Sequence, residues 1–226
     1  MYLSPNITES GFSSTELQSR LAVYQDLRNR AGDTIRLAAQ LTNVPEQVLY
    51  AFAIIESNGN PRAGGNSRYQ GYMQIDTGTA TVEIYYAHKQ GRLNLELRQT
   101  LAKLITPAAL ACITGQMKNE TLPSCQVITR NMLWNPLLNL MVGGLYLRRL
   151  MNRYTENGQV RYDKVVVAYN RGAHIENKFP MQGLSVQQVY NQVTKYIKGA
   201  LGKITQQYIA KLIGQNGILP ALSNFA

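Results

Sequence analysis

The longest uninterrupted apolar run in the chain, Val48 to Ile55, ends at a single carboxylate, Glu56. Asn43-Val44-Pro45 before the run predicts a helix start, because proline is favoured at a first helical position. Asn58-Gly59-Asn60-Pro61 after it cannot stay helical. We therefore expect a buried helix that carries Glu56 to the edge of a core. Desolvation there raises the pKa of a carboxyl, as a general acid requires; the plainer alternative is a helix-terminal glutamate turned into solvent.

Helical spacing recurs over most of the remaining chain. Ser13 and Glu16 have the spacing of a capping box, which predicts a helix from there to about Ala31. Strand signals are few, and the Gly- and Asn-rich residues 62–75 predict a loop or short β structure. We expect a mainly α fold of the α+β type, with this small region as its β part. Further helices are predicted at Asp33–Leu41, from Asp76, and at Leu93–Ile105, Pro136–Arg153, Tyr162–Tyr169, Val186–Leu201 and Ile204–Ile213.

The length predicts one domain with appendages. We expect a flexible N-terminal tail over residues 1–15, a single domain over 16–213 and a C-terminal tail over 214–226. No segment approaches the roughly 20 apolar residues that cross a bilayer. The first residues lack the basic and apolar regions of a secretory signal peptide. We therefore expect a protein made in the cytoplasm that reaches its site of action by another route.

Positive charge is concentrated in the second part of the chain. The net charge is +10; residues 1–96 carry 8 Lys and Arg against 9 Asp and Glu, and residues 97–226 carry 15 against 4. Such asymmetry indicates a polyanionic partner, for which nucleic acid, an anionic membrane and an acidic cell-wall polymer all qualify. No nucleic-acid motif is present, so we do not expect a nucleic-acid partner.

Three motifs in a fixed order resemble the signatures of the soluble lytic transglycosylases, enzymes with a lysozyme-like fold. The first runs from Glu56-Ser57 through Pro61 and Ala63 to Gly71-Tyr72-Met73-Gln74-Ile75. The second is Asn139-Leu140 with Gly143 or Gly144 and then Tyr146-Leu147, and the third is Ala168-Tyr169-Asn170-Arg171-Gly172. Together they extend over about residues 38–200. The resemblance implies a helical bundle around a glycan-binding groove, and peptidoglycan glycan strands as the substrate.

The resemblance also implies roles for individual residues. Glu56 protonates the glycosidic oxygen between N-acetylmuramic acid and N-acetylglucosamine, and then acts as base on the muramic 6-hydroxyl, which gives a 1,6-anhydro product. Ser57 and Tyr169 support Glu56 in this reaction. No cofactor and no metal is implied. The expected substrate-binding residues are Tyr69, Tyr72, Met73, Gln74, Tyr146 and Asn170, and Trp134 is a further stacking candidate.

The sequence departs from the family pattern at several places. Tyr72 replaces the usual Leu, and Gly65 stands in place of a Ser. The 58 residues from Asp76 to Leu133 exceed the short link expected between the first two signatures. They hold Cys112 and Cys125 and predict an inserted lobe at about residues 81–134. These cysteines could form a disulfide or remain two reduced thiols. The sequence leaves both alternatives open, because the redox state of the compartment determines which one forms.

Most glycosidases use two carboxylates, so a partner for Glu56 is worth seeking. Asp76 precedes a helix start and fits an N-cap better than a catalytic role. Glu83 is expected on a solvated helix face. The lack of a convincing second carboxylate favours transglycosylation over the hydrolysis that goose-type lysozymes perform on the same bond.

Two further interpretations remain open. The first is a structural or cell-wall-binding protein of a virion that retains the fold; a phage endolysin is the enzymatic counterpart. The second concerns the C-terminal basic segment, which predicts either weak contact with an anionic membrane or surface polymer, or simply a last helix packed on the core. Its apolar face comprises Tyr196, Ile197, Leu201, Ile204, Tyr208 and Leu212, and its positive charge comes from Lys195, Lys198, Lys203 and Lys211. We expect a monomer.

Overall fold

The computed structural model describes residues 7–116 and 127–225, and it is mainly α-helical with one two-stranded sheet. The chain divides into two compact units. Unit 1 comprises the chain up to Asp26 together with the chain from Leu147 onward, and unit 2 comprises Leu27–Tyr146. Helices α1 (Ser14–Thr42) and α6 (Pro136–Arg153) contribute residues to both units. This helix-rich architecture is the one expected of a lysozyme-like fold.

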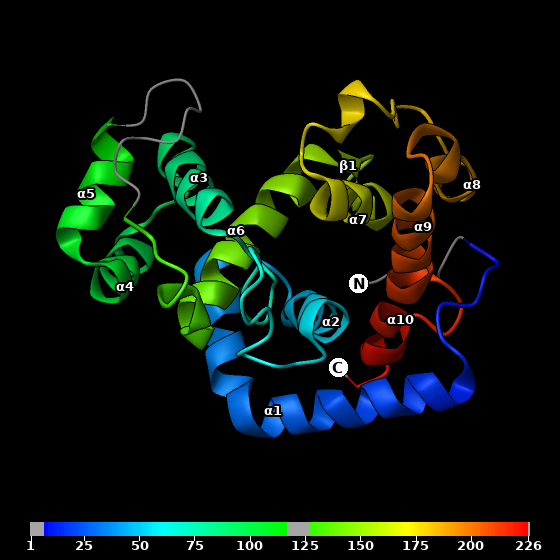
Figure 1. Cartoon of the computed structure of the whole chain (residues 1–226), viewed down its shortest axis with the longest axis horizontal. Coiled ribbons are helices and arrows are strands. Elements are labelled where there is room, and N and C mark those ends of the chain that lie inside the picture. The colour runs from blue at the N-terminus through cyan, green and yellow to red at the C-terminus, as the bar shows by residue number, and fades with distance from the viewer. Residues whose placement is uncertain (1–6, 117–126, 226) are drawn as a thin grey trace. The chain divides into compact units, whose positions relative to one another are not determined.

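Unit 2 contains the apolar helix that ends at Glu56. Besides residues from α1 (Ser14–Thr42) and α6 (Pro136–Arg153), it holds α2 (Glu46–Ser57), α3 (Thr77–Lys89), α4 (Leu95–Ile105), α5 (Pro107–Gln116) and η1 (Met132–Trp134). Helix α5 packs against both α3 and α4 (Figure 1). The described part of the predicted lobe at 81–134 is therefore largely helical.

Unit 1 is built around a group of helices near the end of the chain. Helix α9 packs against α7, α8 and α10, and α8 also contacts α7 (Figure 1). Strands β1 and β2 pair antiparallel and precede α7. The bounds are β1 Thr155–Glu156, β2 Gln159–Val160, α7 Tyr162–Arg171, η2 Ile175–Asn177, α8 Val186–Tyr196, α9 Ala200–Ile213 and α10 Ile218–Ser223.

Several helix boundaries follow from their capping residues. The Ser13 backbone N–H donates to Glu16 Oε2 over 2.9 Å and Glu16 N–H donates to Ser13 Oγ over 3.2 Å, so the predicted capping box is confirmed. Asp76 accepts from Thr79 N–H at 2.9 Å, which confirms the predicted N-cap of α3. Helix α8 begins with a second capping box, formed by Ser185 and Gln188.

Two predicted boundaries are wrong. The expected break near Gly32 does not occur, and α1 continues to Thr42. Gly32 is buried, and a Cβ placed on it would lie 3.4 Å from the Tyr50 hydroxyl. Tertiary packing therefore keeps the helix continuous at this glycine, although glycine has a low helix propensity. The single helix expected over 186–201 instead ends at Tyr196, and α9 begins after Gly199, whose φ of 72° is not helical.

Both ends of the described chain are packed rather than extended as tails. Ile7 and Phe12 are buried, and a Cβ on Gly11 meets the backbone of Ala210 at 2.2 Å. Helix α10, which lies within the expected C-terminal tail, buries Ile218 and Leu222. The division into one catalytic domain over 16–213 stays a prediction.

Candidate active site

Glu56 is the second-last residue of α2 and is half-buried. The helix stops because Asn58 adopts a left-handed conformation with φ 52°, which Asn tolerates better than most residues. The N–H groups of Asn58 and Gly59 then cap the carbonyls of Ile54 and Ala53, at 3.0 and 3.1 Å. These contacts hold the helix end that carries Glu56 in one conformation.

Ser57 follows Glu56 and is also half-buried. Its hydroxyl donates to the Ala53 carbonyl over 2.8 Å, a bond that completes the last turn of α2. The predicted role of Ser57 in orienting Glu56 stays a prediction.

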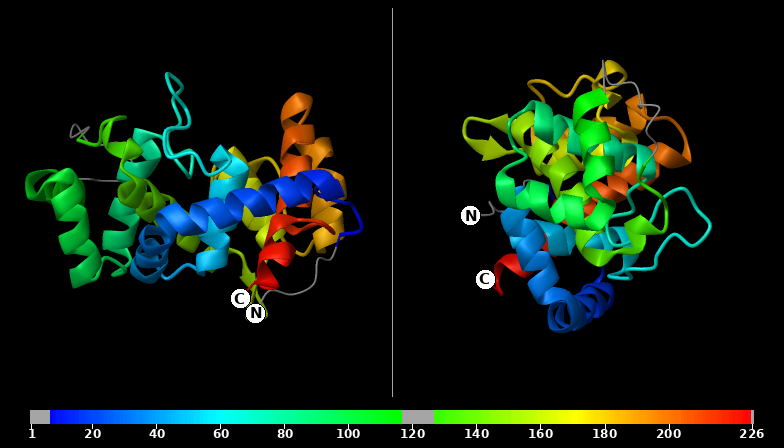
Figure 2. Two further views of the ribbon diagram at one scale, coloured as in Figure 1. Left: turned by 90° about the horizontal axis from the view of Figure 1, so that it is seen from below. Right: turned by 90° about the vertical axis from the view of Figure 1, so that its left-hand side faces the viewer.

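The loop after α2, residues 58–75, extends away from the helices of its unit (Figure 2). It closes on itself where Gly71 N–H donates to Ala63 O over 2.9 Å, and where Gln70 and Ile75 form an isolated antiparallel bridge. Gly71 has φ 72°, and Gln74 has φ 44°, so the Gly71–Ile75 turn requires left-handed backbone. The expected loop or short β region is therefore a tight loop with one bridge.

Asn139 of α6 clamps this turn. Its side-chain Oδ1 accepts from Met73 N–H and its Nδ2 donates to Gln70 O, each over 2.8 Å. Asn139 is only 1% exposed, so water cannot take over either bond. The asparagine of the second signature thereby supports the backbone of the first.

The two glycines of α6 permit close packing beside the clamp. A Cβ on Gly143 would lie 2.6 Å from Met73 Cβ, and one on Gly144 would lie 2.6 Å from Thr42 Oγ1. Real Cβ atoms essentially never approach neighbours so closely. The glycines of the second signature are therefore explained by packing inside unit 2.

The predicted substrate-binding residues of unit 2 differ in exposure. Tyr69 is 49% exposed on the loop, whereas Tyr72, Met73 and Tyr146 are buried. Gln74 is half-buried and donates from Nε2 to Gly71 O over 2.9 Å. Their contacts with sugar stay predictions.

Arg30 of α1, which belongs to none of the three signatures, supports the start of the loop. It donates to the Gly59 carbonyl and, over 3.0 Å, to the Tyr72 hydroxyl. No local pattern marks this residue, because its partners lie 29 and 42 positions away.

The two other carboxylates considered beside Glu56 have different surroundings. Asp76 caps α3 and also lies 3.4 Å from Arg68 Nη2. Glu83, expected on a solvated face, is instead 1% exposed, so that expectation is wrong. The face of α3 that carries Glu83 is therefore covered, and the periodicity of α3 did not reveal which face this would be.

The third signature lies in unit 1. Tyr169 and Asn170 are half-buried near the end of α7. Asn170 Oδ1 lies 2.9 Å from the hydroxyl of buried Thr205 and accepts from Arg171 Nε over 2.9 Å, which ties α7 to α9. The predicted roles of Tyr169 in supporting Glu56 and of Asn170 in lining a groove stay predictions.

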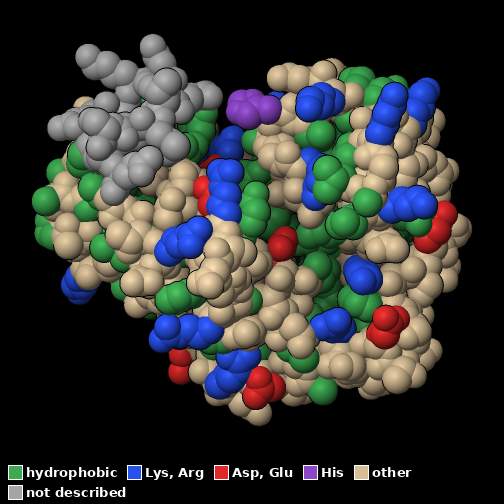
Figure 3. All heavy atoms as spheres, in the orientation of Figure 1, with side chains coloured by type: hydrophobic (Ala, Val, Ile, Leu, Met, Phe, Trp, Pro, Cys, Tyr) green, Lys and Arg blue, Asp and Glu red, His purple; other side chains and the backbone are tan. Residues whose placement is uncertain are grey.

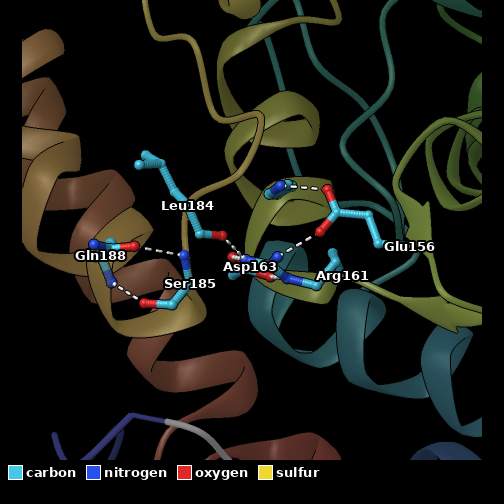
Figure 4. A network of polar contacts seen from close by, with 7 residues as sticks. Glu156, Arg161, Asp163, Leu184, Ser185 and Gln188 are labelled. Carbon is cyan, nitrogen blue, oxygen red and sulfur yellow. Dashed lines mark hydrogen bonds and ion pairs between the residues drawn. The ribbon is translucent and has the colours of Figure 1, made fainter.

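An ion-pair network fixes the start of α7 (Figure 4). Arg161 forms a bidentate pair with Asp163 at 2.7 and 3.0 Å and a second pair with Glu156 at 2.6 Å, and it donates to the Leu184 carbonyl over 2.8 Å. Buried Lys164 also pairs with Glu156. Burial raises the pKa of Glu156, but these two cations outweigh it and hold the pKa below its usual value. The network joins the hairpin, α7 and the segment before α8.

The basic segment near the end of the chain is only partly exposed. Tyr208 and Leu212 are buried in unit 1, which matches the interpretation of helices packed on the core. Leu201 and Ile204 are exposed, with Lys203 between them. Figure 3 shows Lys and Arg side chains spread over the face in view, with fewer Asp and Glu. Contact with an anionic membrane or surface polymer stays a prediction.

Among the residues that the structure describes, none of the helices combines the length and the apolarity that a bilayer span requires. Within residues 7–116 and 127–225, no three His, Cys, Asp or Glu side chains gather into a group that can hold a metal ion. The disulfide question depends on Cys125, which lies outside the described residues.

Comparison with known proteins finds one family model that matches part of the chain. Residues 33–96 match the transglycosylase SLT domain, a domain that acts on cell-wall peptidoglycan. The match includes α2, Glu56, the loop and α3, whereas the second and third signatures lie outside it. No curated protein and no solved structure matches the chain. Residues 33–96 are therefore similar to the transglycosylase SLT domain, and they include the helix end that carries Glu56.

Proposed function

We propose that the chain is a peptidoglycan lytic transglycosylase in which Glu56 is the catalytic acid and base. The observation that carries the proposal is the position of Glu56: a half-buried carboxylate at the end of an apolar helix, inside the segment that matches the SLT domain. A carboxyl at such a boundary keeps access to substrate while the apolar helix behind it favours the protonated form. That is the state in which a general acid enters its reaction.

The proposed reaction has two proton transfers. The Glu56 carboxyl donates its proton to the glycosidic oxygen between N-acetylmuramic acid and N-acetylglucosamine as the bond from that oxygen to the muramic anomeric carbon breaks. The resulting oxocarbenium-like centre is stabilised by the substrate's own acetamido group. The Glu56 carboxylate then removes the proton of the muramic 6-hydroxyl, whose oxygen bonds to the anomeric carbon. The products are a 1,6-anhydro end and a free hydroxyl on the leaving sugar, and no water is consumed.

The surroundings of the other carboxylates favour transglycosylation over hydrolysis. Asp76 is engaged as the N-cap of α3 and by Arg68. Glu83 is almost entirely buried. A goose-type lysozyme that hydrolyses the same bond is the second candidate, and mass spectrometry of the released fragments separates the two, because an anhydro end is lighter than a reducing end by one water.

Replacing Glu56 by Gln tests the proposal. The amide keeps the shape of the side chain but cannot deliver a proton, so release of soluble fragments from purified peptidoglycan should fall at least about a hundredfold. Glu46→Gln is the matched control, because Glu46 is a half-buried glutamate at the other end of the same helix. Full activity in the Glu56→Gln protein would exclude the mechanism.

A structural or cell-wall-binding role in a virion is a different class of function. It predicts that Glu56→Gln leaves biological function unchanged while the protein still binds peptidoglycan. The origin from a bacteriophage and the action as an endolysin stay predictions, as does the monomeric state.

A further inference from the structure

Three arginines lie on two segments of unit 2 that contact one another. Arg62 and Arg68 belong to the loop after α2, and Arg130 belongs to the segment before η1. The Cζ of Arg62 lies 5.4 Å from the centroid of the Trp134 ring, and Arg130 Nη1 donates to the Asn66 carbonyl over 3.4 Å. Residues more than 60 positions apart in sequence therefore form one surface, which we name the arginine loop surface: Arg62, Arg68, Arg130, Tyr69 and Trp134.

The guanidinium groups of this surface are accessible. Arg62 and Arg130 are exposed, and the Arg68 side chain is 72% exposed. Arg68 stacks over Tyr69 with 5.8 Å from its Cζ to the ring centroid. A guanidinium that lies over an aromatic ring still has N–H groups along its edge, and these match a carboxylate in a bidentate arrangement.

Little negative charge balances these cations. Asp76 contacts Arg68 at 3.4 Å, but its carboxylate is buried and already accepts from Thr79. Among the described residues, neither Arg62 nor Arg130 forms an ion pair with a side chain. The surface is therefore suited to an anionic ligand.

The backbone beneath the surface is well ordered by its own contacts. Ser67 N–H donates to Gly64 O over 2.7 Å, and the Ser67 hydroxyl donates to Tyr69 O over 2.8 Å. A Cβ on Gly64 would meet Tyr69 O at 1.9 Å, so the two sides of the loop lie against each other. A loop held in this way has little backbone freedom to lose on binding.

The same loop begins at residue 58, two positions after Glu56. Arg62 lies six positions after Glu56, and a fully extended chain spans at most about 3.6 Å per residue, so their Cα atoms lie within about 22 Å. That distance is comparable with the length of a short peptide. In peptidoglycan, such peptides are attached to N-acetylmuramic acid and carry free carboxylates.

We propose that Arg62, Arg68 and Arg130 bind carboxylates of the peptides attached to the glycan strand, so that the chain distinguishes peptide-bearing glycan from bare glycan. This inference rests on the proposed function. A phosphate-rich wall polymer is the competing ligand. The peptide carboxylates are favoured because they arrive on the very strand that Glu56 would cleave.

Uncross-linked glycan strands, with their peptides and after removal of the peptides at the lactyl amide, provide the test. The triple variant Arg62→Gln, Arg68→Gln and Arg130→Gln should raise KM on peptide-bearing strands about tenfold, since each exposed ion pair contributes a few-fold. Its kcat should stay close to wild type, and its KM on stripped strands should not change. Arg28→Gln, Lys103→Gln and Lys178→Gln make the matched control, because they remove the same charge from exposed positions outside the arginine loop surface.

A binding measurement keeps this test separate from catalysis. Isothermal titration calorimetry of the Glu56→Gln protein with uncross-linked glycan strands, with or without their peptides, should show a preference for peptide-bearing strands that the three arginine substitutions abolish. If the wild type shows no such preference, or if the triple variant weakens binding equally on both materials, the inference is wrong even where Glu56 is essential. If turnover is insensitive to Glu56→Gln but the binding preference depends on the arginines, only the proposed mechanism is wrong.

Two further outcomes concern a competing ligand and the folding of the triple variant. Stronger competition by inorganic polyphosphate than by free wall peptides would assign the surface to phosphate polymers and overturn the inference. Should the triple variant lose its far-UV circular dichroism, the single variants Arg62→Gln and Arg130→Gln carry the test, each with a KM increase of about two- to fivefold on peptide-bearing strands alone.

Discussion

Substitution of Asn139 tests how the Gly71–Ile75 turn is held in place. Asn139→Ala removes the bonds to Met73 N–H and Gln70 O, and both of these residues are completely buried. Water cannot reach the two backbone groups left behind. A buried donor or acceptor without a partner costs about 1 to 3 kcal/mol, so the substitution should lower the free energy of unfolding by about 2 to 6 kcal/mol.

Asn94→Ala is the matched control for this measurement. Asn94 lies in the same unit, is exposed, and makes one N-cap bond to Leu97 N–H at 2.8 Å. Its loss should cost about 1 kcal/mol. Urea unfolding followed by far-UV circular dichroism gives the free energy of unfolding of both variants and of the wild type under identical conditions.

Equal destabilisation by the two substitutions would refute the proposed clamp. Asn139→Asp refines the result, because one carboxylate oxygen still accepts from Met73 N–H while the other faces the Gln70 carbonyl without a proton. It should therefore destabilise more than Asn94→Ala. Release of peptidoglycan fragments by Asn139→Asp, measured well below its unfolding midpoint, should fall if the turn contributes to the active site.

Two other predictions concern packing and charge. Gly143→Ala places a Cβ 2.6 Å from Met73 Cβ and should lower the free energy of unfolding by about 1 to 3 kcal/mol. In the control Gly115→Ala, in α5, the added Cβ meets no atom within 4 Å, so this variant should be neutral or stabilised by up to about 1 kcal/mol. Differential scanning calorimetry of both variants measures the difference, and a Gly143→Ala protein as stable as the wild type would contradict the close packing. Glu156→Gln leaves Lys164 buried without its carboxylate partner. The free energy of unfolding should fall by about 1 to 3 kcal/mol, a value discounted because Glu156 is 39% exposed. Adding Lys164→Met should restore most of the lost stability. Since the pKa of folded Glu156 is depressed, its contribution is present above the ordinary value of 4.5 and is lost as the pH falls through the folded pKa; urea unfolding at neutral and acidic pH should therefore show a smaller acid-induced loss in Glu156→Gln than in the wild type.

Local signals predicted the elements whose causes are local. The caps at Ser13 and Asp76 and the stop at Asn58 depend on residues within a few positions, and all three were recognised. The hairpin of β1 and β2 was missed although Asn157-Gly158 is a typical signal for its turn, and both residues have positive φ. Its strands have two residues each, too few for an alternating pattern.

Contacts between segments far apart in the chain could not be predicted from local sequence patterns. Asn139 reaches Met73 and Gln70 across 66 and 69 positions, so the resemblance marked it without revealing its task. The burial of Glu83 depends on which face of α3 is covered, and a helix that is apolar in several directions does not reveal this. The arginine loop surface was missed for the same reason, because Arg130 joins Arg62 only in the folded chain.

The contact between Gly143 and Met73 has an evolutionary consequence. No residue at position 143 can gain a side chain while position 73 keeps its methionine and the clamp keeps its geometry. Substitutions at these two positions should therefore be inherited as a pair: because the clash involves the Cβ of residue 73, relatives with alanine or serine at 143 should carry glycine at 73. Each half of the pair is deleterious in the other's original background, so the order in which they arise is constrained as well.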